Sequence, residues 1–115
     1  MKRIIIGITG ATGTIYGSRL MEMLREEGDT EIHLVMSPSA KLTLKMEYDV
    51  ESDYINSLAH EVHAPNNIGA SISSGSFASA GMIVAPCSIK TMSNIAMGNT
   101  GDLISRAADV ILKER

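Results

Sequence analysis

Glycine and threonine residues follow an apolar run at the start of the chain. The segment MKRIIIGITGATG carries Gly7, Gly10 and Gly13 at intervals of three residues. Because glycine lacks a Cβ, such a turn lets the backbone approach a ligand closely, and a helix that starts after it directs free N–H groups toward an anion. The pattern predicts a phosphate site. The spacing matches neither the dinucleotide fingerprint nor the P-loop, and a tight packing turn would explain the glycines equally well.

Polar residues also follow two other apolar runs. Ser37 comes after EIHLVM, and the segment from Ser88 to Thr91 comes after GMIVAPC. The carboxyl ends of parallel strands meet at one edge of a sheet, so we expect these residues to converge with the glycine turn. They offer hydroxyls and backbone N–H groups, and Lys90 adds one positive charge. This combination suits a phosphate joined to a polar ring system.

The intervening segments predict the elements that hold these residues in place. Apolar runs alternate with helix-period segments, which predicts an α/β fold: a parallel sheet with helices on both faces. Residues 51–60 could form a short helix, 63–67 read as a loop, and 68–80 look poorly suited to a core. Gly28 is the expected C-cap of the first helix and Asp102 the N-cap of the last. The expected strands are the apolar run before the glycine turn, 31–37 and a buried strand at 81–86 that Pro86 stops, and the expected helices are 14–27, 40–47, 88–98 and 102–115.

Length and charge exclude several classes of protein. The 115 residues predict one domain, 1–115, and the net charge of −3 without a basic cluster argues against nucleic acid as a partner. No apolar run approaches the roughly 20 residues that span a bilayer. The single Cys87 cannot form an internal disulfide, which fits a reducing compartment. We therefore expect a soluble protein of the cytoplasm that makes no membrane contact.

The histidines and the cysteine receive no functional role from the sequence. His60 and His63 are three residues apart and His33 lies in an expected strand, but no third ligand completes a recognisable metal motif. Cys87 reads as a small buried residue, since no histidine lies near it in the chain. We expect no metal site.

Six segments together resemble the UbiX-type flavin prenyltransferases, including the B subunits of hydroxyarylic and phenolic acid decarboxylase systems. These segments run in unbroken order along the whole chain and are GITGATG, LVMSPSA, KMEYD, ISSGSF, APCSIKT and LISRAADVILKER. The combination is far more specific than the glycine turn alone.

The resemblance implies a fold, a reaction and partners. It implies a flavodoxin-like Rossmann architecture with three α/β/α layers and a homododecamer. The implied reaction joins the dimethylallyl group of dimethylallyl monophosphate to N5 and C6 of reduced FMN, without a metal. The prenylated FMN then passes to a UbiD-type decarboxylase.

The resemblance also implies site residues. Thr12, Glu47 and Lys113 would be catalytic, and Glu47 would reach the site across a subunit boundary. From the sequence alone, Arg106 and Lys113 share a helix face and could clamp a phosphate, or they could pair with Asp102, Asp109 or Glu114. The residues expected to contact FMN are Gly10, Ala11, Thr12, Ser37, Ser88, Ile89, Lys90, Thr91 and Arg106.

The chain departs from this family at its end. Family members continue for roughly half as many residues again, adding a strand and a tail with a Tyr and an Arg that bind the prenyl phosphate. We therefore expect that the C-terminal part of the domain is missing here. Two alternatives remain: an FMN carrier without chemistry, and a flavin-dependent cysteine decarboxylase, which is disfavoured because SPSAKLTLKMEYD contains no histidine.

Overall fold

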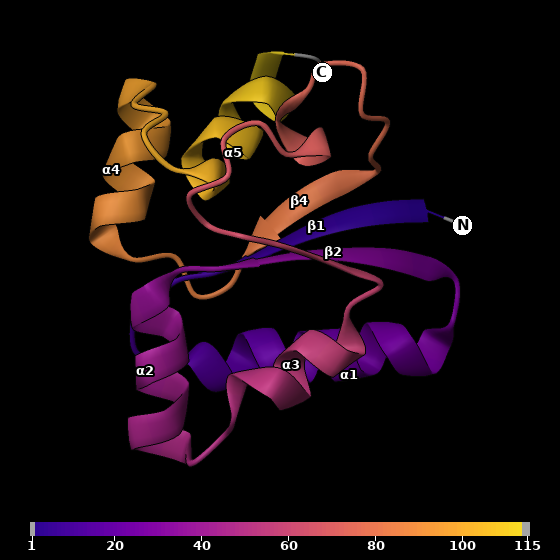
Figure 1. Cartoon of the computed structure of the whole chain (residues 1–115), viewed down its shortest axis with the longest axis vertical. Coiled ribbons are helices and arrows are strands. Elements are labelled where there is room, and N and C mark those ends of the chain that lie inside the picture. The colour runs from indigo at the N-terminus through magenta and orange to yellow at the C-terminus, as the bar shows by residue number, and fades with distance from the viewer. Residues whose placement is uncertain (1, 114–115) are drawn as a thin grey trace.

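Four parallel strands form one sheet in the order β3-β2-β1-β4 (Figure 1). The computed structural model describes residues 2–113 of the chain. Strands β1 and β2 are the long central pair, paired along seven residues each. The strand bounds are Lys2–Ile8 for β1, Thr30–Met36 for β2, Glu61–His63 for β3 and Gly81–Val84 for β4.

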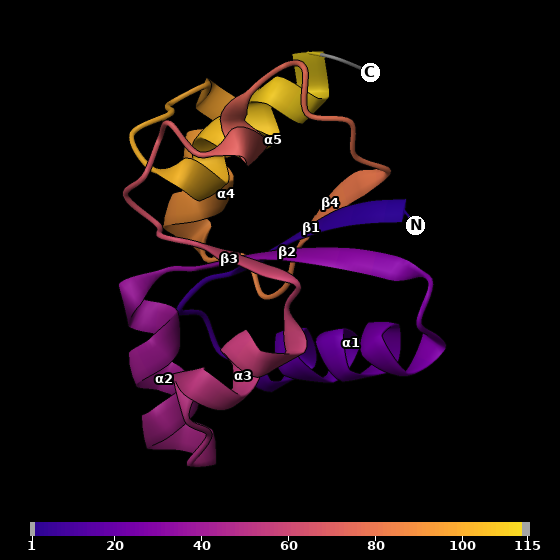
Figure 2. The same cartoon turned by 45° about the vertical axis from the view of Figure 1, so that its right-hand side comes forward.

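Helices cover both faces of this sheet. Three helices lie on one side, and two further helices lie on the other, as Figures 1 and 2 show. This arrangement confirms the expected three-layer, flavodoxin-like α/β/α fold. The first group is α1 (Thr14–Glu27), α2 (Pro38–Tyr48) and α3 (Ser52–Leu58), and the second is α4 (Ile89–Met97) and α5 (Leu103–Lys113), with a 3₁₀ turn at Ser71–Ser73.

Alternate residues of the central strands pack into two separate apolar cores. Side chains of a strand point to opposite faces in turn, so Ile6 and Ile8 of β1 pack toward α1, α2 and α3. Ile5, which precedes Ile6, points to the opposite face and packs toward α5 with Val35 of β2. Both central strands are therefore buried on two faces, which explains their continuous apolar runs.

Two glycines at α1 have conformational or packing reasons to be glycine. Gly28 ends the helix with φ of 84°, the left-handed C-cap that the sequence predicts. Gly17 lies inside the helix, where an added Cβ would overlap the carbonyl oxygen of Ala85. The helix thus packs directly on the backbone of the segment that follows β4.

Three details differ from the sequence expectations. Residues 61–63 form the short strand β3, which no sequence pattern indicates. Strand β4 lies at a sheet edge, so Ile83 is 40% exposed although the sequence predicts a buried strand. The composition of segment 68–80 predicts that it stays out of the core, yet Ala70 and Ile72 are buried in the core on the α5 side of the sheet.

No helix within residues 2–113 is long and apolar enough to cross a bilayer.

Candidate functional site

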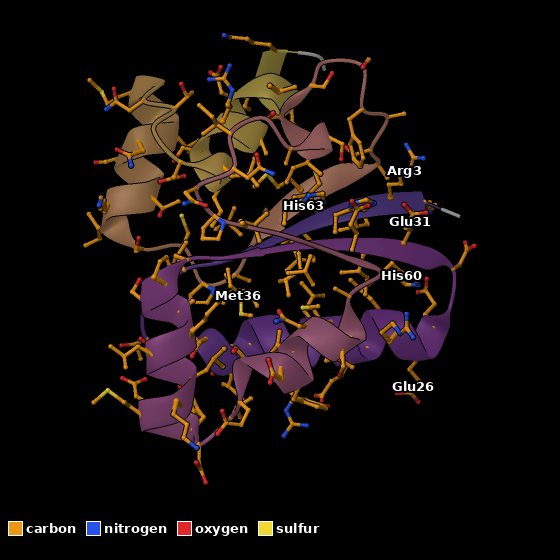
Figure 3. The ribbon with its side chains drawn as sticks, in the orientation of Figure 1. Arg3, Glu26, Glu31, Met36, His60 and His63 are labelled. Carbon is orange, nitrogen blue, oxygen red and sulfur yellow. The ribbon has the colours of Figure 1, made fainter. Side chains whose placement is uncertain are left out.

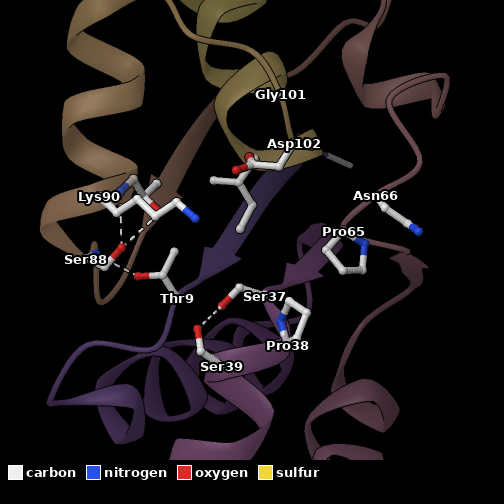
Figure 4. A pocket seen from close by; sticks show the side chains of 12 residues that line it. Thr9, Ser37, Pro38, Ser39, Pro65, Asn66, Ser88, Lys90, Gly101 and Asp102 are labelled. Atoms are coloured by element: carbon white, nitrogen blue, oxygen red, sulfur yellow. Dashed lines mark hydrogen bonds between the residues drawn. The ribbon is translucent and has the colours of Figure 1, made fainter.

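A cavity of about 440 Å³ opens beyond the carboxyl ends of β1 and β2, and we call it the strand-tip cavity. Side chains from five parts of the chain line it, and Figure 4 shows them converging. Five of the lining side chains carry a hydroxyl, and the lining also holds one amide, one amino group and one carboxylate. The lining residues are Thr9, Ser37, Pro38, Ser39, Pro65, Asn66, Ser88, Lys90, Thr91, Gly101, Asp102 and Ile104.

Thr9 joins two of these parts. Its hydroxyl donates a hydrogen bond to the carbonyl of Pro86 at 2.7 Å and accepts one from the backbone N–H of Ser88, also at 2.7 Å. The side chain is 1% exposed. Thr9 therefore holds the β4–α4 loop against the end of β1, as Figure 4 shows for Ser88. The sequence motifs did not single out this residue; its signal is a hydroxyl directly after the strand.

Serine caps place two helix N-termini at the cavity. Ser37 caps α2 by accepting a hydrogen bond from the N–H of Ala40 at 3.2 Å. Ser88 caps α4 by accepting one from the N–H of Thr91, also at 3.2 Å, and donates to the Thr91 hydroxyl at 3.0 Å. Each cap satisfies one backbone N–H group, and the other N–H groups of each first turn stay available to an anion.

Two charged side chains, those of Asp102 and Lys90, line the cavity. Asp102 caps α5, as the sequence predicts, because one carboxylate oxygen accepts a hydrogen bond from the N–H of Ser105 at 2.8 Å. The N–H of Leu103 donates to the carbonyl of Pro65 at 2.9 Å, which ties α5 to the loop after β3. Lys90 contributes the positive charge at the rim.

The structure brings Ser37, Ser88, Lys90 and Thr91 together in the cavity lining, as the sequence leads one to expect. Gly10 lies next to α2, where an added Cβ would overlap the side chain of Ser39. The other expected FMN contacts lie outside the lining. Ala11 and Thr12 are in the turn before α1, and Ile89 is 79% exposed at the start of α4.

Three expected site residues lie on exposed helix surfaces. Glu47 is exposed near the end of α2, and Arg106 is exposed on α5. Lys113 forms an ion pair with Asp109 at 2.9 Å, and its side chain is 72% exposed. The sequence leaves two arrangements open, a phosphate clamp and a helix ion pair. The structure of this chain contains the ion pair.

Cys87 is partly buried just before Ser88. Burial raises the pKa of its thiol, so the thiol form predominates at neutral pH. The sequence shows no recognisable metal motif around the histidines, yet Nδ1 of His33 and Nε2 of His63 lie 3.0 Å apart beside Glu61. The short strand β3 creates this proximity.

The cavity meets the requirements of a flavin mononucleotide. Its volume falls within the range of about 300–1,000 Å³ typical of cofactor sites. The helices α1, α2, α4 and α5 all begin at this edge of the sheet, and the N-termini of α2 and α4 lie at the cavity lining, where they can receive a phosphate. Neutral hydroxyls and an amide can pair with the polar edge of the ring and with a sugar-like chain.

Known proteins resemble this chain closely. The flavin prenyltransferase UbiX of Escherichia coli K12 is 53% identical over 115 residues, which is 100% of this chain and 61% of that protein. The crystal structure of AnUbiX (PadA1) in complex with FMN and dimethylallyl pyrophosphate matches with a TM-score of 0.95 and 48% identity. That match covers 98% of this chain and 60% of that one.

A dodecameric FMN-dependent UbiX-like decarboxylase from Escherichia coli O157:H7 also matches with a TM-score of 0.95, at 47% identity, over 97% of this chain and 60% of that one. The chain thus spans about three fifths of the length of these relatives. The model of the family described as Flavoprotein matches residues 1–115. With the parallel sheet and the strand-tip cavity described above, this full-length match shows that the chain belongs to the flavoprotein family.

Proposed function

We propose that this protein is a flavin prenyltransferase that transfers a dimethylallyl group from dimethylallyl monophosphate to N5 and C6 of reduced FMN. The observation that carries the proposal is the strand-tip cavity, where two capped helix N-termini and five hydroxyl side chains surround a space of flavin size. The likeness to UbiX enzymes over the whole chain supports the same reaction.

The chain's own residues would bind and orient the flavin. Ser37, Ser88 and Thr91 would hold its polar atoms, and Gly10 and Ala11 would let the backbone lie close to it. Thr12 would place its hydroxyl near the ring. Reduced FMN, when bound, supplies the nitrogen and carbon that accept the dimethylallyl group.

Breaking the allylic C–O bond of the co-substrate sets the electrostatic task. Negative charge grows on the departing phosphate while the carbon fragment becomes cationic, so fixed positive charge near the phosphate lowers the barrier. Lys90 supplies such a charge at the cavity rim. Arg106 and Lys113 would join it only if Lys113 leaves Asp109, and the transferase proposal predicts that exchange.

Glu47 fits this reaction through a neighbouring subunit. It lies at the exposed end of α2, on the surface of its own chain. In a homododecamer, as in the dodecameric relative, a second chain could bring this carboxylate to the co-substrate, where it would handle a proton at the phosphate or the flavin. We also propose a UbiD-type decarboxylase as the recipient of prenylated FMN and the cytoplasm as the location.

The direct test is to incubate the protein with reduced FMN and dimethylallyl monophosphate without oxygen and to determine the flavin's mass. The expected product is heavier than FMN by one dimethylallyl substituent. Glu47→Gln should lower turnover more than FMN affinity, and Glu26→Gln on α1 is the matched control that should change neither. Unchanged flavin mass with tight FMN retention would reject the transferase.

That rejecting result would support the alternative of an FMN carrier, which shares every flavin contact named above. The cysteine decarboxylase alternative predicts loss of CO₂ from a peptide ending in cysteine. It lacks support in the segment after β2, because residues 37–49 contain no histidine.

A further inference from the structure

Two copies of the pattern Glu-x-His lie side by side on neighbouring strands. Glu31 and His33 belong to β2, and Glu61 and His63 belong to β3; we call these four residues the histidine ladder. The strands are parallel, with His33 opposite Glu61 and Val35 opposite His63. Residues two apart on a strand share a face, so all four side chains lie on the same face of the sheet. Figure 3 shows Glu31 and His63 on the side of α5, and His60 on the side of α1.

Three ligand atoms of the ladder converge on one point. Nδ1 of His33 lies 3.0 Å from Nε2 of His63 and 3.6 Å from Oε2 of Glu61. All three ligand atoms lie within 4.8 Å of one another. Ligands at about 2.0–2.1 Å from a tetrahedral zinc ion are roughly 3.3 Å apart, a value between the two shorter separations. Glu61 has a side chain that is 56% exposed, so it can turn to close the longest separation.

The surroundings prepare His33 to act as a ligand. Its Nε2–H donates to Oε1 of Glu31 at 2.8 Å, which leaves the lone pair on Nδ1, the atom that faces His63 and Glu61. Arg3 lies 3.5 Å from the same Glu31 oxygen, and the edge of Phe77 packs on the His33 ring at 5.0 Å. A carboxylate behind a histidine is the arrangement that orients metal-binding imidazoles in proteins.

His63 is held beside His33. The residue is 7% exposed, and its ring stacks on the His33 ring with the ring centroids 5.3 Å apart. The access route is the Glu61 side of the cluster, since Glu61 is exposed. No ladder residue lines the strand-tip cavity, so the two sites are separate within residues 2–113.

We propose that the histidine ladder binds one divalent transition-metal ion of the zinc class through Nδ1 of His33, Nε2 of His63 and the Glu61 carboxylate. Solvent completes the coordination, and Glu31 positions His33. Two nitrogens and one carboxylate form a donor set that suits Zn²⁺ or Co²⁺ better than Mg²⁺ or Ca²⁺. The ion would clamp the three-residue strand β3 to β2. This proposal stands independently of the flavin reaction.

The test is a titration of the chelator-treated, dialysed chain with Co²⁺. We expect one equivalent to bind with the visible absorption of a four- or five-coordinate ion, and one equivalent of Zn²⁺ to remove that absorption. Glu61→Gln and His63→Gln should each weaken binding at least tenfold. Glu31→Gln should weaken it by about 10-fold to 100-fold, as for other partners of metal-bound histidines.

The control is Glu26→Gln on α1, which lies outside the ladder and should bind Co²⁺ as the unmodified chain does. Far-ultraviolet circular dichroism checks that every variant is folded; Glu61→Gln changes an exposed side chain and keeps the test valid if His63→Gln does not fold. The absence of one-equivalent Co²⁺ absorption, or equal binding by Glu61→Gln, would overturn the proposal and leave His33 and His63 as a hydrogen-bonded pair.

Discussion

The strand-tip cavity and the histidine ladder lie on the same sheet, but their residues are assembled differently. The cavity collects residues from five loops and helix ends that are up to about ninety positions apart in the chain, between Thr9 and Asp102. The ladder uses only two neighbouring strands and a fixed register. Its side chains are charged or ionisable, whereas the cavity depends on hydroxyls and backbone N–H groups.

Each site is therefore vulnerable to a different kind of change. The cavity depends on close packing between loops, so removing one contact between two loops should disturb several parts of the lining together. The ladder depends on the pairing of β2 with β3. Substitutions in the ladder should therefore leave flavin binding unchanged. Four experiments, in order of decreasing effect, test this separation.

Gly17→Ala should perturb the molecule most. The added Cβ would overlap the Ala85 carbonyl, so α1 or the loop after β4 must move. We expect the free energy of unfolding to fall by roughly 1–3 kcal/mol, in the range of overpacked sites. Urea unfolding measures it. Gly81→Ala is the control, because no atom of the described residues beyond its two chain neighbours lies within 4 Å of the Cβ it would add. Equal stability of the two variants would refute the close packing of α1 on this loop.

Thr9→Val tests the hydrogen bonds between the end of β1 and the β4–α4 loop. Valine keeps the shape but leaves the Ser88 N–H without its partner, and the Pro86 carbonyl keeps only its hydrogen bond from the backbone N–H of residue 9 at 3.3 Å. The expected cost is about 1–3 kcal/mol of unfolding free energy, together with weaker FMN binding. Thr9→Ser should restore both, because it keeps the hydroxyl. Failure of serine to rescue FMN binding would show that Thr9 acts only by filling space.

Glu31→Gln tests the ladder. The hydrogen bond from His33 lowers the pKa of the Glu31 carboxyl, so this group is ionised at neutral pH. The uncharged amide makes a weaker hydrogen bond to the same ring nitrogen. We expect a small decrease in melting temperature and unchanged FMN affinity, which calorimetry and flavin fluorescence measure. A loss of FMN affinity would mean that the two sites are coupled.

Cys87 reports on the packing of the cavity rim without a substitution. Because burial raises the pKa of its thiol, less thiolate is present at pH 8 than for an exposed cysteine. Alkylation by iodoacetamide should therefore be slower in the folded chain than in urea, and its rate should rise as pH passes through the raised pKa. Mass spectrometry follows the reaction. Equal rates in both states would be inconsistent with a packed rim.

The sequence predicts the cavity better than the ladder for a physical reason. Ser37 and Ser88 directly follow apolar runs and precede helix-period segments, so local patterns are sufficient to identify both caps. The ladder requires that Glu61 and His63 belong to a strand, and three residues show no clear alternation. The register that sets His33 opposite Glu61 is a tertiary feature. The repeated Glu-x-His spacing is the signal that the sequence offers.

Other differences have similar causes. Ile83 reads as buried because β4 is apolar, but exposure depends on whether a strand has a neighbour on both sides. Thr9 is hard to identify from the sequence because the partners of its hydroxyl are 77 and 79 residues away. In the proposed reaction Glu47 would act through a second chain, and local patterns in the sequence of one chain do not identify such a contact.

Binding of FMN in the strand-tip cavity can be measured by a fluorescence titration of FMN with the chain, with Thr9→Val and with Thr9→Ser. We expect quenching that saturates at one FMN per chain, with a clearly weaker affinity in Thr9→Val that Thr9→Ser restores. Folded protein that leaves FMN fluorescence unchanged, or that binds FMN equally well in all three forms, would rule out the cavity as the flavin site.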